Sequence, residues 1–463
     1  TKVRDAGNIV ITNPDMLHSG ILPHHTKWIR LFENLEYIVV DELHTYRGVF
    51  GSHVANVFRR LKRICAYYGS HPKWIMTSAT IANPVELAER LTEEDVVLVD
   101  QNGAPQGKKH LIFYNPPVVN EALGIRRSAT LETKRIASKL VEADIQTIVF
   151  ARSRVRVEVL LTYLQELTRR ELGPKSIVGY RGGYLPSERR EIERRLRDGE
   201  IRAVVSTNAL ELGVDIGQLE ACVLNGYPGT VASLWQQAGR AGRRHSESLV
   251  IFVASSSSLD QLVVEQPDLI LDRSPEAARL DPNNLLILVD HLKCAAFELP
   301  FHKGERFGTV DTEDILDFLT DAQVLHERAD KYYWMTDSFP AHEISLRTSD
   351  QENVVIVDQT AKHAVIGEMD TFSAMTLLHD EAIYLHGAEQ YQVEKLDFEE
   401  KKAYVRQVDV DYYTDANLAV ELKVLEENKS DGVKTFGEVS VIAMATLFKK
   451  IKFGTHENIG SGP

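Results

Sequence analysis

Apolar and polar positions alternate in a regular way through the first 255 residues of the chain. Short apolar runs rich in β-branched residues are separated by amphipathic or charged stretches of helical length. This alternation is typical of a parallel β-sheet covered by helices on both faces. Ligands of such open sheets bind beyond the carboxyl ends of the strands, so polar clusters that follow these runs are candidate functional residues. The runs predict strands at Asn8–Thr12, Tyr37–Val40, Trp74–Thr77, Thr147–Ala151, Arg202–Ser206, Ala221–Leu224 and Leu249–Val253.

A stretch rich in Gly, Pro, Asn and Gln interrupts this pattern between residues 101 and 128. It contains Gln101–Gly107, followed by Asn115, Pro116 and Pro117. Residues of these types break helices and strands and are typical of connections. The sequence therefore predicts two α/β lobes, at residues 1–100 and 129–255, joined by a linker at residues 101–128.

The pattern changes beyond residue 255. Pro282–Phe301 and Glu313–Asp321 have the apolar spacing of helices, and the strand-like runs Val324–Arg328 and Tyr332–Met335 flank a short turn. Two helices followed by a two-stranded ribbon indicate a connector and a winged helix at residues 256–340.

Strand-like alternation then predicts a small β-rich domain at residues 341–425. The runs that carry this prediction include Val354–Val357, Ala382–Leu385, Gln392–Leu396 and Ala403–Val408. Residues 426–463 are too few to form a domain by themselves, and we interpret them as the start of a truncated C-terminal domain.

Composition is that of an ordinary globular protein, because 43% of the 463 residues are hydrophobic and 26% are charged. No apolar run reaches the roughly 18 residues that a transmembrane helix needs, and the first residues do not resemble a secretory signal, so no membrane association is expected. The cysteines, Cys65, Cys222 and Cys294, are too far apart in sequence to indicate a zinc site or a redox pair. A reducing, cytoplasmic location is therefore expected.

Charge is distributed unevenly along the chain, whose net charge is −14. Residues 1–255 carry 34 Lys and Arg against 28 Asp and Glu, a net charge of +6, whereas residues 256–463 carry 19 against 39, a net charge of −20. The basic first part is compatible with a surface that follows nucleic-acid phosphates, although a run of charges is more often a solvated helix face.

The acidic cluster Asp41-Glu42-Leu43-His44 directly follows the predicted strand Tyr37–Val40. A sheet that hydrolyses nucleotides needs one acid at a strand end to hold Mg²⁺ and a neighbouring carboxylate to orient and deprotonate the attacking water. Asp41 fits the first role and Glu42 the second. The alternative interpretation is a solvated acidic turn.

A second cluster, Gln236–Arg243, places two arginines three residues apart among glycines. Arginines held in this way can reach the γ-phosphate of a nucleotide and stabilise the charge that develops during phosphoryl transfer. Taken by itself, the cluster would be interpreted as a basic surface helix.

Four further clusters share the order of known helicase motifs. They are Thr12-Asn13-Pro14-Asp15, Ser78-Ala79-Thr80, Phe150-Ala151-Arg152-Ser153 and Ser206–Asp215. With the acidic and arginine clusters, they resemble motifs Ib, II, III, IV, V and VI of superfamily 2 helicases, in that order. The resemblance covers nearly all of residues 1–255 and implies two RecA-like lobes, the first of them incomplete.

The chain resembles more narrowly the MrfA/YprA-type bacterial repair helicases. The segments that carry this resemblance are Asp41–Cys65, Tyr180–Arg190, His291–Pro300, Ala382–His386 and Asp411–Thr414. The resemblance implies an ATP-dependent DNA helicase of DNA repair that uses ATP and Mg²⁺ and moves 3′ to 5′ on single-stranded or partly duplex DNA. It does not indicate protein partners.

The resemblance also implies roles for residues at matching positions. Asp41 and Glu42 would serve Mg²⁺ and the attacking water, and Arg240 and Arg243 would be arginine fingers. The remaining positions would face the nucleotide (Gln236, Gly213, Asp215), contact the DNA backbone (Thr12, Asn13, Arg152, Thr207) or couple the two sites (His44, Ser78, Thr80). Helix capping is the alternative interpretation for Ser78 and Thr80.

Two departures from the family pattern affect this expectation. The 463 residues contain no Gly-x-x-x-x-Gly-Lys-[Ser/Thr] loop, and the family's C-terminal cysteine cluster is missing. We therefore expect the phosphate-binding loop to precede residue 1, and the chain as given to be inactive by itself. An RNA helicase and a non-catalytic DNA-binding fragment are the alternative functions.

Overall fold

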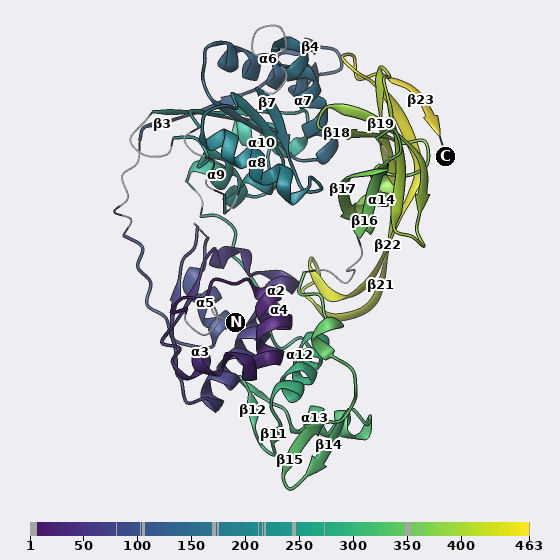
Figure 1. Ribbon diagram of the computed structural model, residues 1–463. Coiled ribbons are helices and arrows are strands. Elements are labelled where there is room, and N and C mark those ends of the chain that lie inside the picture. The colour runs from purple at the N-terminus through teal and green to yellow at the C-terminus, as the bar shows by residue number, and fades with distance from the viewer. Residues whose placement is uncertain are drawn as a thin grey trace. The chain divides into compact units, whose positions relative to one another are not determined.

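The computed structural model describes residues 7–79, 81–101, 103, 107–168, 173, 176–211, 213–214, 216, 219–242, 247–272, 274–347, 353–361 and 363–462. The chain forms two compact units and passes between them three times (Figure 1). Unit 1 contains residues 1–103 and 274–351, and unit 2 contains residues 104–273 and 352–463. In the described part of the chain, no helix is both long and apolar enough to cross a membrane.

The first stretch of unit 1 is built around the long helix α4 and a short parallel sheet. Strands β1 and β2 pair in parallel, with Tyr37 opposite Lys73 and Val40 opposite Met76. The elements are α2 (Pro14–Met16), η1 (Leu17–Ile21), η2 (Leu22–Trp28), α3 (Ile29–Glu33), β1 (Tyr37–Val40), η3 (Leu43–Thr45), α4 (Gly48–Tyr67), β2 (Lys73–Met76) and α5 (Pro84–Thr92).

The strand predicted at Asn8–Thr12 is wrong. These residues form no strand, and the side chains of Ile9 and Ile11 are 84% and 94% exposed. Apolar alternation makes a strand only where a neighbouring strand accepts its hydrogen bonds, and none of the described residues pairs with this segment.

The second stretch of unit 1 confirms the predicted helices and ribbon beyond residue 281. Ala329 and Asp330 both have positive φ, as the tight turn of a two-residue hairpin requires, and they join β14 to β15. The elements are α12 (Leu285–Glu298), β11 (Phe301–His302), β12 (Arg306–Phe307), β13 (Val310–Asp311), α13 (Glu313–Asp321), β14 (Leu325–Arg328), β15 (Lys331–Trp334) and η5 (Pro340–His342).

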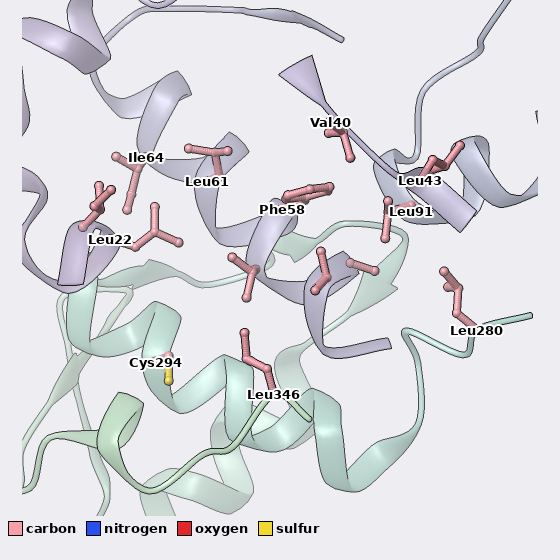
Figure 2. Packing of buried hydrophobic residues seen from close by; sticks show 14 of the residues in the cluster. Leu22, Val40, Leu43, Phe58, Leu61, Ile64, Leu91, Leu280, Cys294 and Leu346 are labelled. Atoms are coloured by element: carbon pink, nitrogen blue, oxygen red, sulfur yellow. The ribbon is translucent and has the colours of Figure 1, made fainter. Parts of the chain in front are cut away.

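One hydrophobic core unites the two stretches of unit 1. Phe58 and Leu61 from α4 pack in the same cluster as Val40 of β1, Cys294 of α12 and Leu346 (Figure 2). The amphipathic helix α4 therefore buries its apolar side against residues that are more than 200 positions away in the sequence.

A buried polar network crosses the same interface between α4 and α12. The Arg60 guanidinium pairs with Glu298, and both side chains are almost fully buried. Arg60 Nη1 also donates to Nδ1 of His18 at 2.6 Å. An arginine can only donate, so the neutral His18 ring carries its proton on Nε2, which donates to the Ala341 carbonyl at 3.0 Å.

Two more histidines extend this network. His291 Nδ1 accepts from Arg60 at 3.4 Å, and its Nε2 donates to Nδ1 of His53 at 3.1 Å. Burial lowers the pKa of all three imidazoles, and the charge of Arg60 lowers the pKa of His18 and His291 further, so that the pKa of His18 is about 3. The hydrogen bonds of this network can all form together only while the imidazoles of His18, His291 and His53 are neutral.

Unit 1 is therefore expected to lose stability as pH falls below the pKa of histidine in an unfolded chain, about 6.5. Below pH 6.5 the His18 side chain becomes protonated in the unfolded chain, whereas in the folded protein it stays neutral until about pH 3. The free energy of unfolding is therefore highest above pH 6.5 and decreases as the pH falls below that value. His18 alone should lower the free energy of unfolding by about 1.4 kcal/mol per pH unit. Urea unfolding between about pH 7 and pH 5 measures this slope.

The variant His18→Gln should reduce the pH dependence of the free energy of unfolding by about 1.4 kcal/mol per pH unit, the contribution of one proton. His71→Gln, which changes an exposed imidazole, should leave this pH dependence unchanged. An equal slope in wild type and His18→Gln would show that the buried ring does not carry the effect.

The first stretch of unit 2 has a six-stranded, fully parallel sheet of order β3-β10-β9-β6-β8-β7, with helices along it. The predicted strands of this lobe are confirmed to within one residue at their ends. The elements are β3 (Lys109–Tyr114), β4 (Val118–Asn120), β5 (Ile125–Arg126), α6 (Ala129–Glu142), β6 (Thr147–Ala151), α7 (Arg154–Thr168), β7 (Ile177–Tyr180), α8 (Pro186–Arg197), β8 (Ala203–Ser206), η4 (Asn208–Leu210), β9 (Ala221–Asn225), α9 (Val231–Ala238), β10 (Ser248–Val253), α10 (Ser258–Glu265) and α11 (Asp268–Leu271).

The interpretation of residues 101–128 as a linker is wrong in part. Lys109–Tyr114 forms β3, an edge strand that pairs along its whole length with β10. This strand was difficult to predict because residues that break helices and strands flank it on both sides. As an edge strand it is also partly exposed, and its apolar run is short and begins with polar residues. The elements α10 and α11, assigned to the connector, belong to unit 2.

The second stretch of unit 2 is β-rich, as predicted. A five-stranded sheet of order β17-β16-β20-β19-β18 is followed by a three-stranded antiparallel sheet of order β21-β22-β23. The elements are β16 (Asn353–Asp358), β17 (Ala364–Asp370), α14 (Thr371–Leu377), β18 (Ile383–His386), β19 (Glu389–Asp397), β20 (Lys402–Val408), β21 (Tyr412–Ser430), β22 (Thr435–Lys452) and β23 (Asn458–Gly462).

The predicted boundary between residues 425 and 426 falls inside β21. This strand pairs with β22 from Tyr412↔Lys452 to Ser430↔Thr435, so residues 426–463 continue the hairpin and do not begin a separate fold. Glu426 and Glu427 lie within this strand, since exposed strand positions accept charge without breaking the ladder.

The segment Tyr180–Arg190 joins the sheet of this lobe to the β-rich part. Arg181 is buried and pairs with the buried Glu158 of α7 at 2.7 Å. Its Nη2 donates to the Leu385 carbonyl of β18 at 2.8 Å, and the Ala388 amide donates to Glu158 at 3.1 Å. Since a buried arginine needs both a charge partner and acceptors, this part of the family-like sequence has a structural role.

Candidate nucleotide and nucleic-acid site

The acidic cluster lies at the carboxyl end of β1, beside the end of β2. Leu43 N donates to the Thr77 carbonyl at 2.8 Å, and Thr77 N donates to the Val40 carbonyl at 2.9 Å. The parallel pairing of β1 and β2 thus continues into the two clusters and brings residues 41–44 and 77–79 together. This is the strand-end position that the sequence predicts for a ligand site.

Asp41 is exposed, and one of its oxygens is held by the protein. Oδ1 accepts from the Thr77 hydroxyl at 2.5 Å and from the Glu42 amide at 2.9 Å. Both donors use the same oxygen, so the carboxylate has a defined orientation while Oδ2 can take another ligand. Carboxylate oxygens are ligands that Mg²⁺ prefers, so the arrangement fits the predicted magnesium role.

Glu42 adopts a left-handed backbone conformation, with φ 54° and ψ 45°. Residues other than glycine rarely adopt this region, and such strain is often found at functional sites. Its carboxylate lies 3.5 Å from Nδ1 of the buried His44. The Ala79 amide donates to the same nitrogen at 3.1 Å, so Nδ1 carries no proton and the neutral ring is protonated on Nε2.

Burial, followed by the charge of Arg47, lowers the pKa of His44 and supports the neutral ring. His44 therefore connects the acidic cluster to the segment after β2 by a hydrogen bond to the main chain. The coupling role expected for His44 remains a prediction.

The coupling role expected for Ser78 has less support. Its hydroxyl donates to the carbonyl of the next residue, Ala79, at 2.7 Å, and it caps none of the helices that the structure describes. Thr80 lies outside the described residues. The sequence interpretation missed Thr77, the side chain that does reach Asp41; its position at the end of a strand predicted at Trp74–Thr77 was the available signal.

The second lobe brings together the segment after β8 and the segment after α9. Arg240 is buried, and its Nε and Nη2 donate to the Glu211 carbonyl at 3.1 and 2.6 Å, while Nη1 donates to the Val214 carbonyl at 2.7 Å. The Glu211 carboxylate accepts from Gln237 Nε2 at 2.9 Å and from the Ser233 hydroxyl at 2.6 Å. Glu211 was not among the residues that the sequence pattern indicated.

These contacts qualify the predicted role of Arg240 as an arginine finger, because its guanidinium binds main-chain carbonyls in this structure. Gly213 has φ +70°, which favours glycine in the turn beside Arg240. Gln236 is half-buried on α9. Asp215 and Arg243 lie outside the described residues, so their roles remain predictions.

The residues expected to contact DNA occupy two places. Arg152 is exposed just beyond β6, and Thr207 follows β8, where Phe150 and Ser206 are paired neighbours. Arg152 and Thr207 therefore lie beyond the carboxyl ends of neighbouring strands of the same sheet. Thr207 is only 8% exposed, and its hydroxyl accepts from the Ala209 amide at 3.4 Å.

Thr12 and Asn13 lie in unit 1. Asn13 caps α2, where its side chain accepts from the Met16 amide at 2.8 Å, and the exposed Thr12 hydroxyl bonds to the Asn13 carbonyl at 3.4 Å. Capping accounts for Asn13 structurally, and a DNA contact of either residue remains a prediction. No group of three or more His, Cys, Asp or Glu side chains suited to a metal occurs among the residues that the structure describes.

Three protein-family models match parts of the chain. Residues 1–88 match the DEAD/DEAH box helicase model, residues 132–245 match the helicase conserved C-terminal domain, and residues 280–349 match the winged helix domain of the ATP-dependent helicase HRQ1. Together with the observed sheets, these matches confirm the predicted fold class of two RecA-like lobes, a winged helix and a β-rich region.

Individual proteins are similar over most of the chain. The uncharacterized ATP-dependent helicase YprA of Bacillus subtilis is 67% identical over 468 residues, which are 100% of this chain and 62% of YprA. The ATP-dependent helicase HRQ1 of Saccharomyces cerevisiae is 38% identical over 89% of this chain and 39% of its own length. The chain thus spans less than two thirds of either relative.

Solved structures show the same relationship. The crystal structure of the DUF1998 helicase MrfA bound to DNA has a TM-score of 0.93 and 66% identity, and covers 100% of this chain and 63% of the MrfA chain. The structure of MrfA bound to DNA and AMPPNP has a TM-score of 0.92 at the same identity and coverage.

Proposed function

Because the chain belongs to the YprA/MrfA type of superfamily 2 DEAD/DEAH-box helicases, we propose that its protein is an ATP-dependent DNA helicase. The observation that carries this proposal is the strand-end arrangement of Asp41, Thr77 and His44 in a chain whose structural relative MrfA was solved with DNA and AMPPNP. We further propose 3′ to 5′ movement and a role in DNA repair, in line with the family resemblance.

The residues of unit 1 supply the chemistry of this proposal. Oδ2 of Asp41 would be a ligand of Mg²⁺, which supplies the charge that neutralises the phosphates. The Thr77 hydroxyl keeps the carboxylate in the orientation that exposes Oδ2. Glu42 would orient the attacking water and accept its proton. His44 links this site to the segment after β2 through the Ala79 amide.

In the second lobe, the residues just beyond the carboxyl ends of β6 and β8 would contact the DNA strand. Arg152 would bind backbone phosphates, and Thr207 lies in the turn beside it. Contacts to the backbone carry no sequence preference, which suits a motor that must advance along any sequence.

The variant Thr77→Val keeps the branched shape but removes the hydroxyl that orients Asp41. We expect the Mg²⁺ concentration for half-maximal ATPase activity to rise about three- to tenfold, because one hydrogen bond to a charged group is lost. A magnesium titration of the full-length protein measures this shift. Thr77→Ser retains the hydroxyl and should behave as wild type. If Thr77→Val has the wild-type magnesium requirement, Thr77 does not position Asp41.

The proposed function is tested by ATP hydrolysis of the full-length protein with single-stranded DNA and with RNA of the same sequence. Stimulation by DNA well above that by RNA supports a DNA helicase. Stronger stimulation by RNA would identify an RNA helicase, since the 2′-hydroxyl is the feature that distinguishes the two. DNA binding without any ATPase activity would favour a non-catalytic binding protein.

A further inference from the structure

Glu211 is at the centre of the contacts that join the two functional segments of the second lobe. It follows η4 in the turn after β8, and only 7% of it is exposed. Its carboxylate binds two side chains of α9, Ser233 and Gln237, which are four residues apart and therefore lie on one face of the helix. Its carbonyl binds Arg240 beyond the end of α9.

The contacts of Glu211 join a segment expected at the DNA to a segment expected at the nucleotide. Thr207, expected at the DNA, is four residues before Glu211 in the same turn. Arg240 and Gln236, expected at the nucleotide, belong to the segment that Glu211 holds. The neighbouring Leu210 and Leu234 are fully buried and apolar, so they make no polar side-chain contact between these segments.

A buried carboxylate is costly unless its oxygens are hydrogen-bonded, and a leucine would fill the position more simply. Two neutral donors, one on each oxygen, satisfy Glu211, and no salt bridge to it occurs among the described residues. A displacement of the turn after β8 would break both bonds at once. The two bonds therefore favour movement of the turn and α9 as one unit.

We propose that Glu211 is a positioning residue that couples DNA contact by the turn after β8 to nucleotide turnover supported by the segment after α9. The inference rests on the proposed function and adds to it the residue through which the two events communicate within the second lobe. Glu211 does not contact DNA or nucleotide in this role.

The experiment compares ATP hydrolysis of the full-length protein with and without single-stranded DNA. The ratio of the two rates is expected to fall about tenfold in Glu211→Ala, because two hydrogen bonds to a charged group are lost. Glu211→Gln keeps the shape and can accept from Ser233, so it should restore most of the ratio. Glu247→Ala, which removes an exposed glutamate of the same lobe, is the matched control.

A role limited to stability would lower the melting temperature and both rates together, and would leave their ratio unchanged. If Glu211→Ala does not fold, Ser233→Ala decides, since it removes only one of the two bonds. A reduced ratio with an unchanged melting temperature supports the coupling role, and a wild-type ratio in Ser233→Ala overturns it.

The two proposals fail in different ways. If DNA does not stimulate the wild-type protein, the proposed function itself is wrong. If the wild-type protein is stimulated and Glu211→Ala is stimulated to the same degree, only the role of Glu211 is wrong.

Discussion

Glu42→Gln in the full-length protein is expected to bind ATP as tightly as wild type and to lose nearly all turnover. The amide keeps the size of the side chain but cannot accept the proton of the attacking water. Loss of a general base lowers rates by about 10²–10⁴. The measurements are steady-state ATPase activity with saturating DNA and nucleotide affinity by equilibrium binding.

The matched control is Glu36→Gln, which neutralises an exposed glutamate immediately before β1. It should hydrolyse ATP at the wild-type rate. ATPase activity of Glu42→Gln close to that of wild type would remove Glu42 from the mechanism. Loss of nucleotide affinity together with turnover would indicate that the Glu42 carboxylate also contributes to nucleotide binding.

Arg243→Ala is expected to lose most DNA-stimulated ATPase activity while nucleotide affinity changes less. An arginine finger acts mainly on the charge of the transition state, and its removal costs about 10³–10⁵ in rate in other nucleotide hydrolases. Arg243→Lys should not restore full activity, because an ammonium lacks the planar fork of a guanidinium. Rate and affinity are measured separately, as turnover number and dissociation constant.

Arg240→Ala distinguishes the two arginines. Arg240 holds the Glu211 and Val214 carbonyls, so its loss should lower the melting temperature as well as turnover. Arg197→Ala, which changes an exposed arginine of α8, is the control. If Arg243→Ala hydrolyses ATP normally but binds DNA weakly, Arg243 belongs to the DNA surface and its assignment to the nucleotide is wrong.

Strands that are buried on both faces were predictable, because their apolar runs are long and continuous. Thr147–Ala151 was predicted with the bounds that the structure shows, and all five of its residues are buried. Edge strands were predicted unevenly: Tyr37–Val40 was predicted with its observed bounds although three of its four residues are not buried, whereas Ile177–Tyr180 was not predicted. Lys109–Tyr114 was assigned to a linker, and Asn8–Thr12 was predicted as a strand, because edge strands depend on a neighbour that sequence alternation does not reveal.

The candidate site shows the same division. Asp41, Glu42 and His44 could be identified because they lie within four residues of one another and directly follow an apolar strand. Thr77, which orients Asp41, is 36 positions away and looks like any other strand-end threonine. Glu211 has no distinctive sequence context either, since its partners lie on α9, more than 20 positions further along the chain.

Local features of this protein could be predicted from the order of its residues: the buried central strands, the helices beyond residue 281, the order of the helicase motifs and the acidic residues at a strand end. Each of these depends on residues close together in the chain. The pairing of distant side chains, such as Arg60 with Glu298 and Arg181 with Glu158, is visible in the folded structure alone. A buried charge is stable only beside its partner, and the spacing of residues along a chain does not specify which partner the fold will bring to it.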